Sequence, residues 1–149
     1  MAPEKKGDGE GFSPEEKAAM KERAAETKAA KARGKGKQAD GEADVKAKIA
    51  EMEPGDRELA QALHALVAEV APGLAPRTWY GMPAYAKDGK VLMFFQASAK
   101  FSTRYCTLGF SDTATLDDGA MWPTAYALTT MDEPTTQRIR ELLERAGAA

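Results

Sequence analysis

The chain has 149 residues and a formal net charge of −2, and charged residues make up 30% of it. This length suits one domain. The slightly acidic balance argues against a nucleic-acid-binding domain, which would usually present a net basic face. We therefore do not expect nucleic acid as a partner.

Membrane and secretory signals are also missing from the sequence. No apolar run approaches the roughly 18–20 residues that span a bilayer, and the N-terminus does not resemble a signal peptide. The one cysteine, Cys106, cannot form an internal disulfide, which is typical of a reducing compartment. We expect a cytoplasmic protein with no membrane partner.

The first part of the chain differs in composition from the rest. Residues 1–54 hold twelve Lys or Arg and twelve Asp or Glu, with one of the eleven aromatic rings. The capping box at Ser13–Glu16 predicts a helix that runs to about Arg33. This helix has no wide apolar stripe, which favours a solvated helix, and whether it docks is left open. We expect residues 1–42 to form a mobile extension, or alternatively an arm that recruits a partner, and residues 43–149 to form the domain.

The domain is predicted to begin with two helices. Val45, Ile49 and Met52 recur at the spacing of a short amphipathic helix. Asp56 is expected to cap the next helix. The apolar face of that helix comprises Leu59, Leu63, Leu66, Val67 and Val70. His64 lies away from this face and is predicted to be a solvated surface residue.

The aromatic residues mark the first strands. The stretch from Trp79 to Ala86 is rich in rings, and Gly81 and Pro83 within it indicate an irregular or edge strand. The pair Asp88-Gly89 lies between two apolar runs and predicts a type I′ hairpin turn. The run from Val91 to Phe95 is apolar throughout, so it should be a central strand.

The last third of the chain completes a sheet and adds a helix. We expect strands at residues 104–110 and 124–129, with a short helical turn after Ser111. Asp132 opens a final helix that ends at Gly147. The pattern of helix, antiparallel sheet of about four or five strands, and helix predicts an α+β two-layer domain with helices on one sheet face.

The aromatic rings of the stretch that starts at Trp79, together with Trp122, lie beside glycine, proline and methionine in the sequence. Such rings could line a concave apolar pocket. A lysine and an arginine nearby could orient an anionic or carbonyl group there. The candidate ligand-binding residues are Trp79, Tyr80, Met82, Tyr85, Lys100, Arg104 and Trp122. The alternative is that these rings only form the core of a small sheet domain.

Acidic residues give a second candidate site. Asp117 and Asp118 are the best acidic pair, and Asp112 could approach them after folding. Hard cations prefer clustered oxygen ligands, so these three aspartates are candidate metal ligands. The alternative is turn chemistry, because Asp before Gly favours turns. No nucleophile–base arrangement is evident, and Cys106 is expected to be a small buried residue, so we name no catalytic residue.

Several motifs, in order, resemble the YdhG-like domains, also called domain of unknown function 1801. The motifs are Trp79-Tyr80-Gly81-Met82-Pro83-Ala84-Tyr85, Lys100-Phe101, Tyr105, Thr107-Leu108-Gly109-Phe110, Leu116-Asp117-Asp118-Gly119 and Met121-Trp122-Pro123. The similarity covers about Ala43 to Arg145, and the N-terminal extension resembles that of actinobacterial members. The resemblance implies a frataxin-like fold and a bacterial intracellular iron chaperone with iron as its ligand.

Three functions follow as hypotheses. The first is a non-enzymatic binding domain of the YdhG-like family that handles iron. The second is a module that binds a small anionic molecule in the aromatic pocket. The third is an interaction module that recruits a protein or nucleic acid through a mobile arm, residues 1–42.

Overall fold

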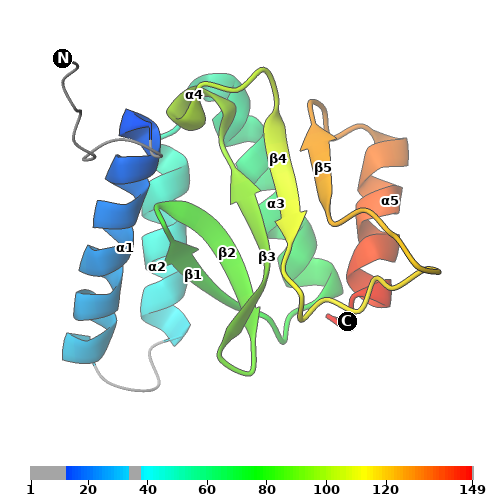
Figure 1. The fold of residues 1–149 in the computed structure, drawn as a ribbon, viewed down its shortest axis with the longest axis horizontal. Coiled ribbons are helices and arrows are strands. Elements are labelled where there is room, and N and C mark those ends of the chain that lie inside the picture. The colour runs from blue at the N-terminus through cyan, green and yellow to red at the C-terminus, as the bar shows by residue number, and fades with distance from the viewer. Residues whose placement is uncertain (1–12, 34–37, 149) are drawn as a thin grey trace, which may run out of the picture.

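The structure, a computed structural model, describes residues 13–33 and 38–148. These form five helices and five strands (Figure 1). In chain order they are α1 (Pro14–Arg33), α2 (Gln38–Ala50), α3 (Pro54–Val70), β1 (Ala75–Trp79), β2 (Met82–Lys87), β3 (Lys90–Gln96), α4 (Ser98–Phe101), β4 (Cys106–Phe110), β5 (Ala125–Leu128) and α5 (Glu133–Arg145). The predicted α+β class with an antiparallel sheet is confirmed.

The strands lie side by side in the order β1-β2-β3-β4-β5, and every neighbouring pair is antiparallel. Figure 1 shows α3 behind the sheet, α1 and α2 beside β1, and α5 beside β5. Within the described ranges, none of the helices has the length and apolar character that crossing a bilayer requires.

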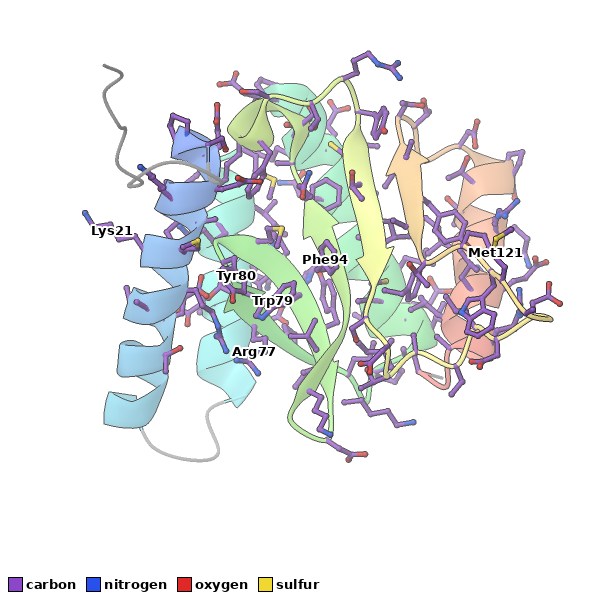
Figure 2. The ribbon with its side chains drawn as sticks, in the orientation of Figure 1. Lys21, Arg77, Trp79, Tyr80, Phe94 and Met121 are labelled. Carbon is purple, nitrogen blue, oxygen red and sulfur yellow. The ribbon has the colours of Figure 1, made fainter. Side chains whose placement is uncertain are left out.

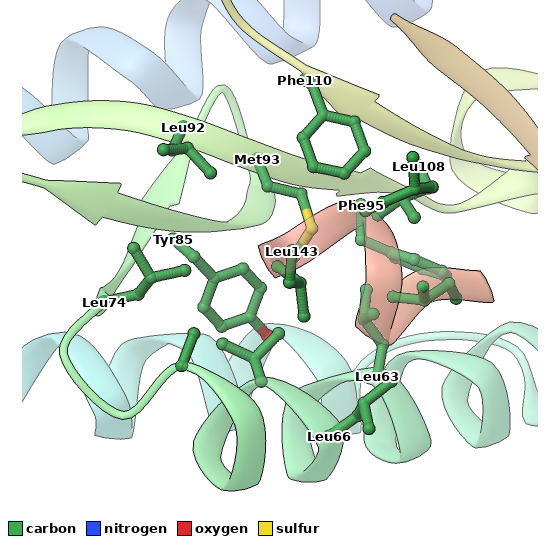
Figure 3. Close-up of a cluster of buried hydrophobic side chains, with 14 of the residues drawn as sticks. Leu63, Leu66, Leu74, Tyr85, Leu92, Met93, Phe95, Leu108, Phe110 and Leu143 are labelled. Carbon is green, nitrogen blue, oxygen red and sulfur yellow. The ribbon is translucent and has the colours of Figure 1, made fainter. Parts of the chain in front are cut away.

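One face of the sheet forms the core with α3 and α5 (Figure 3). Side chains alternate between the two faces of a strand, and the register pairs Tyr85 with Met93 and Phe95 with Leu108 on this face. All four are at most 1% exposed. They meet Leu63 of α3 and Leu143 of α5, which are fully buried. Removing this apolar surface from water is the main force that holds the two layers together.

The other face of the sheet carries rings, yet no described helix lies across it (Figures 1 and 2). Trp79 of β1 and Phe94 of β3 meet above β2, with their ring centroids 5.3 Å apart. They can meet because the residue between them, Ala84, is small. On the next strand the Phe94 ring lies over Gly109, where an added Cβ would be 2.2 Å from its Cζ atom.

Three local signals set element boundaries as expected. The Ser13 hydroxyl accepts from the Glu16 N–H over 3.0 Å, and the Glu16 carboxylate accepts from the Ser13 N–H over 2.9 Å, which confirms the capping box. Asp132 caps α5 by accepting from the Thr135 N–H over 3.0 Å. The turn between β2 and β3 is formed by Asp88 and Gly89, both with positive φ.

The single strand predicted over residues 79–86 is wrong, because the chain reverses within it. Tyr80 and Gly81 have φ of 54° and 77° and form a two-residue turn between β1 and β2. A tyrosine with positive φ is uncommon, so the pair gave no recognisable turn signal. We expected an irregular strand at Gly81, and the chain instead reverses its direction there.

The helices also differ in detail from the expectations. Glu53 occupies the N-cap position of α3, where its side chain makes no capping hydrogen bond, and Asp56 lies in the first turn of that helix. The short turn expected after Ser111 is present as a single turn, in which the Ala114 N–H donates to the Ser111 carbonyl over 3.1 Å, whereas the short helix α4 was not predicted. Helix α2 already begins at Gln38, so the predicted boundary between residues 42 and 43 falls inside it.

Replacing Gly109 by alanine should destabilise the domain, because the new methyl group would displace the Phe94 ring from the open sheet face. We expect a loss of about 1–3 kcal/mol in the free energy of unfolding, measured by urea denaturation. Gly55→Ala is the matched control, because no atom lies within 4 Å of its added Cβ. Equal stability of the two variants would contradict this packing.

Candidate functional site

The turn between β1 and β2 holds a carboxylate. Two successive residues with left-handed backbone direct their N–H groups the same way, which creates a small anion-binding concavity. Here the N–H groups of Tyr80 and Gly81 donate to the two carboxylate oxygens of Glu26, each over 3.0 Å. The acceptor comes from α1, more than fifty residues earlier in the chain.

A second carboxylate lies beside the first. Glu22, one helical turn before Glu26, accepts from Lys100 Nζ over 2.6 Å and from Lys48 Nζ over 3.0 Å. Burial raises the pKa of Glu22, but the two ammonium groups outweigh it, so the pKa lies below its ordinary value. Burial likewise lowers the pKa of Lys48, and the pairing with Glu22 more than compensates, so that pKa is raised.

Gly81 allows these groups to approach the turn closely. An added Cβ would lie 1.9 Å from Oε1 of Glu22 and 2.4 Å from Nζ of Lys100. Lys100 also donates to the Gly81 carbonyl over 3.3 Å. Glycine is therefore required here both for its positive φ and for the space beside it.

A pocket of about 330 Å³ opens next to the turn. Met82, Pro83 and Phe101 contribute apolar walls. The charged groups of the lining are the ammonium groups of Lys48 and Lys100 and the carboxylates of Glu51, Glu53 and Asp56. A mixture of apolar walls and a few polar groups is common in small-molecule sites.

Cations also lie near the open sheet face (Figure 2). The guanidinium of Arg23 lies 5.8 Å from the centre of the Tyr80 ring, and that ring meets Trp79 edge to face at 5.0 Å. Arg77 is half-buried on the same face as Trp79. Its pKa is lowered by burial and by the like charge of Arg23, only partly offset by Glu26.

The structure brings together four of the seven predicted ligand-binding residues: Trp79, Tyr80, Met82 and Lys100 surround the turn. The other three lie elsewhere. Tyr85 faces α3 in the core, and Trp122 packs against the core from the segment between β4 and β5. Arg104 is exposed, with its guanidinium 5.2 Å from the Tyr105 ring centre. The predicted residues therefore do not line one common pocket.

The predicted metal ligands Asp112, Asp117 and Asp118 are all exposed. Among the described residues, no three His, Cys, Asp or Glu side chains come close enough together to hold a metal ion. The three aspartates are therefore not assembled as a site, and iron binding stays a prediction from the resemblance.

Cys106 and Asp56 lie together in a buried, hydrogen-bonded environment. Cys106 is 1% exposed, which confirms the expected buried cysteine, and burial together with Asp56 raises its pKa to about 11. Asp56 is itself buried and accepts from the Ser98 hydroxyl, the Ala99 N–H and the Cys106 thiol over 2.8, 2.9 and 3.2 Å. It thus ties the start of α3 to α4, instead of capping its own helix.

The prediction that His64 is a solvated surface residue is wrong. Its Nδ1 atom lies 2.8 Å from the Tyr85 hydroxyl and its Nε2 atom 2.9 Å from the Glu42 carboxylate. Burial raises the pKa of Tyr85, so its hydroxyl stays protonated and bonds to Nδ1. The carboxylate of Glu42 accepts from Nε2–H. The hydrogen bond with His64 outweighs burial and holds the pKa of Glu42 below its usual range.

Sequence reasoning missed Glu22, Glu26, Arg77 and Phe94. The one available signal was the i, i+4 spacing of the two glutamates, which places them on one face of α1. That spacing is common on solvated helices, so it did not single out a contact. Neither protein-family models nor curated proteins nor solved structures gave a match to this chain. The family therefore stays a prediction from its motifs.

Asp56→Asn should destabilise the domain by about 1–3 kcal/mol at neutral pH, because the negative charge is lost and an NH₂ group replaces one of the two buried oxygens that accept the three hydrogen bonds. Burial raises the pKa of Asp56, but its hydrogen bonds outweigh this and lower it below the ordinary value. The carboxylate therefore stabilises the fold above its unfolded pKa of about 3.9, and this contribution is lost as the pH falls through the lower folded pKa.

Urea denaturation of wild type and variant, at neutral pH and at successively lower pH, measures this difference. The exposed Asp112→Asn substitution is the control and should change stability little. A gap between wild type and Asp56→Asn that is the same at every pH would show that the charge of Asp56 does not contribute.

Proposed function

We propose that this chain is a non-enzymatic binding domain, of the kind that the YdhG-like resemblance implies, and that its ligand is a small flat organic anion. The ligand would lie on the open face of the sheet against Trp79 and Phe94, with its negative charge directed to Arg77.

The observation that carries the proposal is the pairing of half-buried rings with crowded cations on a face that no described helix covers. Trp79 and Phe94 offer an apolar surface on which a flat ligand can stack. Burial lowers the pKa of Arg77, and repulsion between Arg77 and Arg23 lowers it further. A negative group placed between them would relieve this repulsion, and a guanidinium binds a carboxylate or phosphate in a fixed planar geometry.

Fluorescence of Trp79 tests the proposal in a Trp122→Phe background, where Trp79 is the one remaining tryptophan. Benzoate is the anionic probe and benzyl alcohol its uncharged counterpart. We expect saturable quenching by benzoate with an affinity about tenfold higher than that of the alcohol, which corresponds to about 1.4 kcal/mol.

Arg77→Gln should remove this preference for benzoate, because the charge that orients the anion is lost. Arg104→Gln is the matched control, since Arg104 is exposed and stacks on Tyr105 away from Trp79. Equal affinities for the acid and the alcohol, or equal effects of the two arginine substitutions, would contradict the proposed ligand.

Anaerobic titration with Fe²⁺, followed by amide NMR, tests the iron-handling role that the resemblance implies. Localised shifts at Asp112, Asp117 and Asp118 that disappear in Asp117→Ala plus Asp118→Ala would favour that role over an organic anion. Uniform broadening, or no change, would remove the support for iron.

A further inference from the structure

We propose that the Tyr80–Gly81 turn and Lys100 form a separate binding site for a carboxylate or phosphate group, and that α1 occupies this site with its own glutamates. Glu26 and Glu22 would stand where the oxygens of an external anion bind. The inference goes beyond ligand binding on the sheet face, because its donors are two backbone N–H groups and an ammonium group at the end of the sheet.

The donor geometry of the turn does not depend on α1. The pairing of Trp79 with Met82 closes the hairpin, and the left-handed conformations of Tyr80 and Gly81 follow from that closure. The two N–H groups therefore point to a common position whether or not a carboxylate is present. The bound Glu26 shows that this position accepts both oxygens of a carboxylate at hydrogen-bonding distance.

The charges around the turn also favour an anion. Lys100 and Lys48 both pair with Glu22, and Arg77 lies within reach of the charge of Glu26. If α1 moved away, the turn would lose both carboxylates and keep its two N–H donors and Lys100, while Lys48 would keep its ion pair with Glu51 at 3.6 Å. Such a surface would attract a negatively charged group, because the two N–H donors and the charge of Lys100 would otherwise be left uncompensated.

The attachment of α1 is suited to exchange with an external anion. In its described side chains, Ala19 is the one buried apolar residue, and Met20 is 42% exposed. The contacts that hold the helix are mostly polar: Glu22 and Glu26 at the turn, and Glu15 with the Ser102 hydroxyl at 3.0 Å. Partly exposed ion pairs of this kind contribute little to stability, so an anion in solution can compete with them.

The test compares the full chain with its Glu26→Gln variant, using inorganic phosphate and, separately, acetate as probes. Glutamine has the same shape, but it carries no charge and presents an NH₂ group to one of the two N–H donors. Binding is followed through the amide resonances of Tyr80 and Gly81. Because an internal occupant reduces apparent affinity, we expect at least about tenfold tighter binding in Glu26→Gln than in wild type.

Two further variants make the result specific. Glu16→Gln removes the same charge from the same helix, and glutamine can still complete the capping box with Ser13, so this control should bind like wild type. Adding Lys100→Met to Glu26→Gln should abolish the gain. Thermal melts of all variants verify that the domain remains folded.

Two outcomes would overturn the proposal. If the probes shift the Tyr80 and Gly81 resonances equally in wild type and Glu26→Gln, α1 does not occupy the site. If neither probe shifts them in any folded variant, the turn is not an anion site. The quenching of Trp79 fluorescence by benzoate tests binding on the sheet face and is independent of both outcomes. A negative result at the turn can therefore be distinguished from a negative result for the sheet face. A preference for phosphate over acetate, or the reverse, identifies the anion.

Discussion

Two consecutive residues with left-handed backbone, Tyr80 and Gly81, reverse the chain between β1 and β2. This reversal places Trp79 opposite Met82 and directs two N–H groups toward α1. A left-handed tyrosine costs about 1–2 kcal/mol, which the closure of the hairpin offsets. The contact of α1 with the sheet and the approach of Lys100 both depend on this one turn.

The two faces of the sheet are packed in different ways. On the helical face, large side chains such as Phe95 and Leu108 fill the space up to α3 and α5. On the other face, small residues at Ala84 and Gly109 let the rings of Trp79 and Phe94 lie against the strands. The rings thus protect the backbone while keeping part of their surface toward solvent, and this makes the face suited to contact with another molecule.

The sequence predicted those features whose causes are local. The capping box at Ser13, the Asp88-Gly89 turn and the cap at Asp132 each involve residues within a few positions of one another, and all three are confirmed. The α+β class follows from the same patterns. The buried Cys106 followed from its apolar neighbours.

The parts that sequence reasoning missed are contacts between distant residues. Glu26 reaches the turn across more than fifty positions, Lys100 meets Glu22 across 78, and His64 joins Tyr85 across 21. No periodic pattern encodes such pairs, because a glutamate that docks and one that is solvated look alike in sequence. For the same reason, the predicted aromatic residues divide between the two faces of the sheet, and the predicted aspartates do not converge.

The environment of Cys106 bears on how this molecule can be labelled. A thiol reacts with alkylating agents and oxidants through its thiolate form. At neutral pH the buried side chain is almost entirely protonated, because its pKa is about 11, and it donates to Asp56. Cys106 should therefore be unreactive toward such reagents in the folded protein. A cysteine introduced at an exposed position of α1 would then carry a spin or fluorescent label alone, with no need to remove the native one.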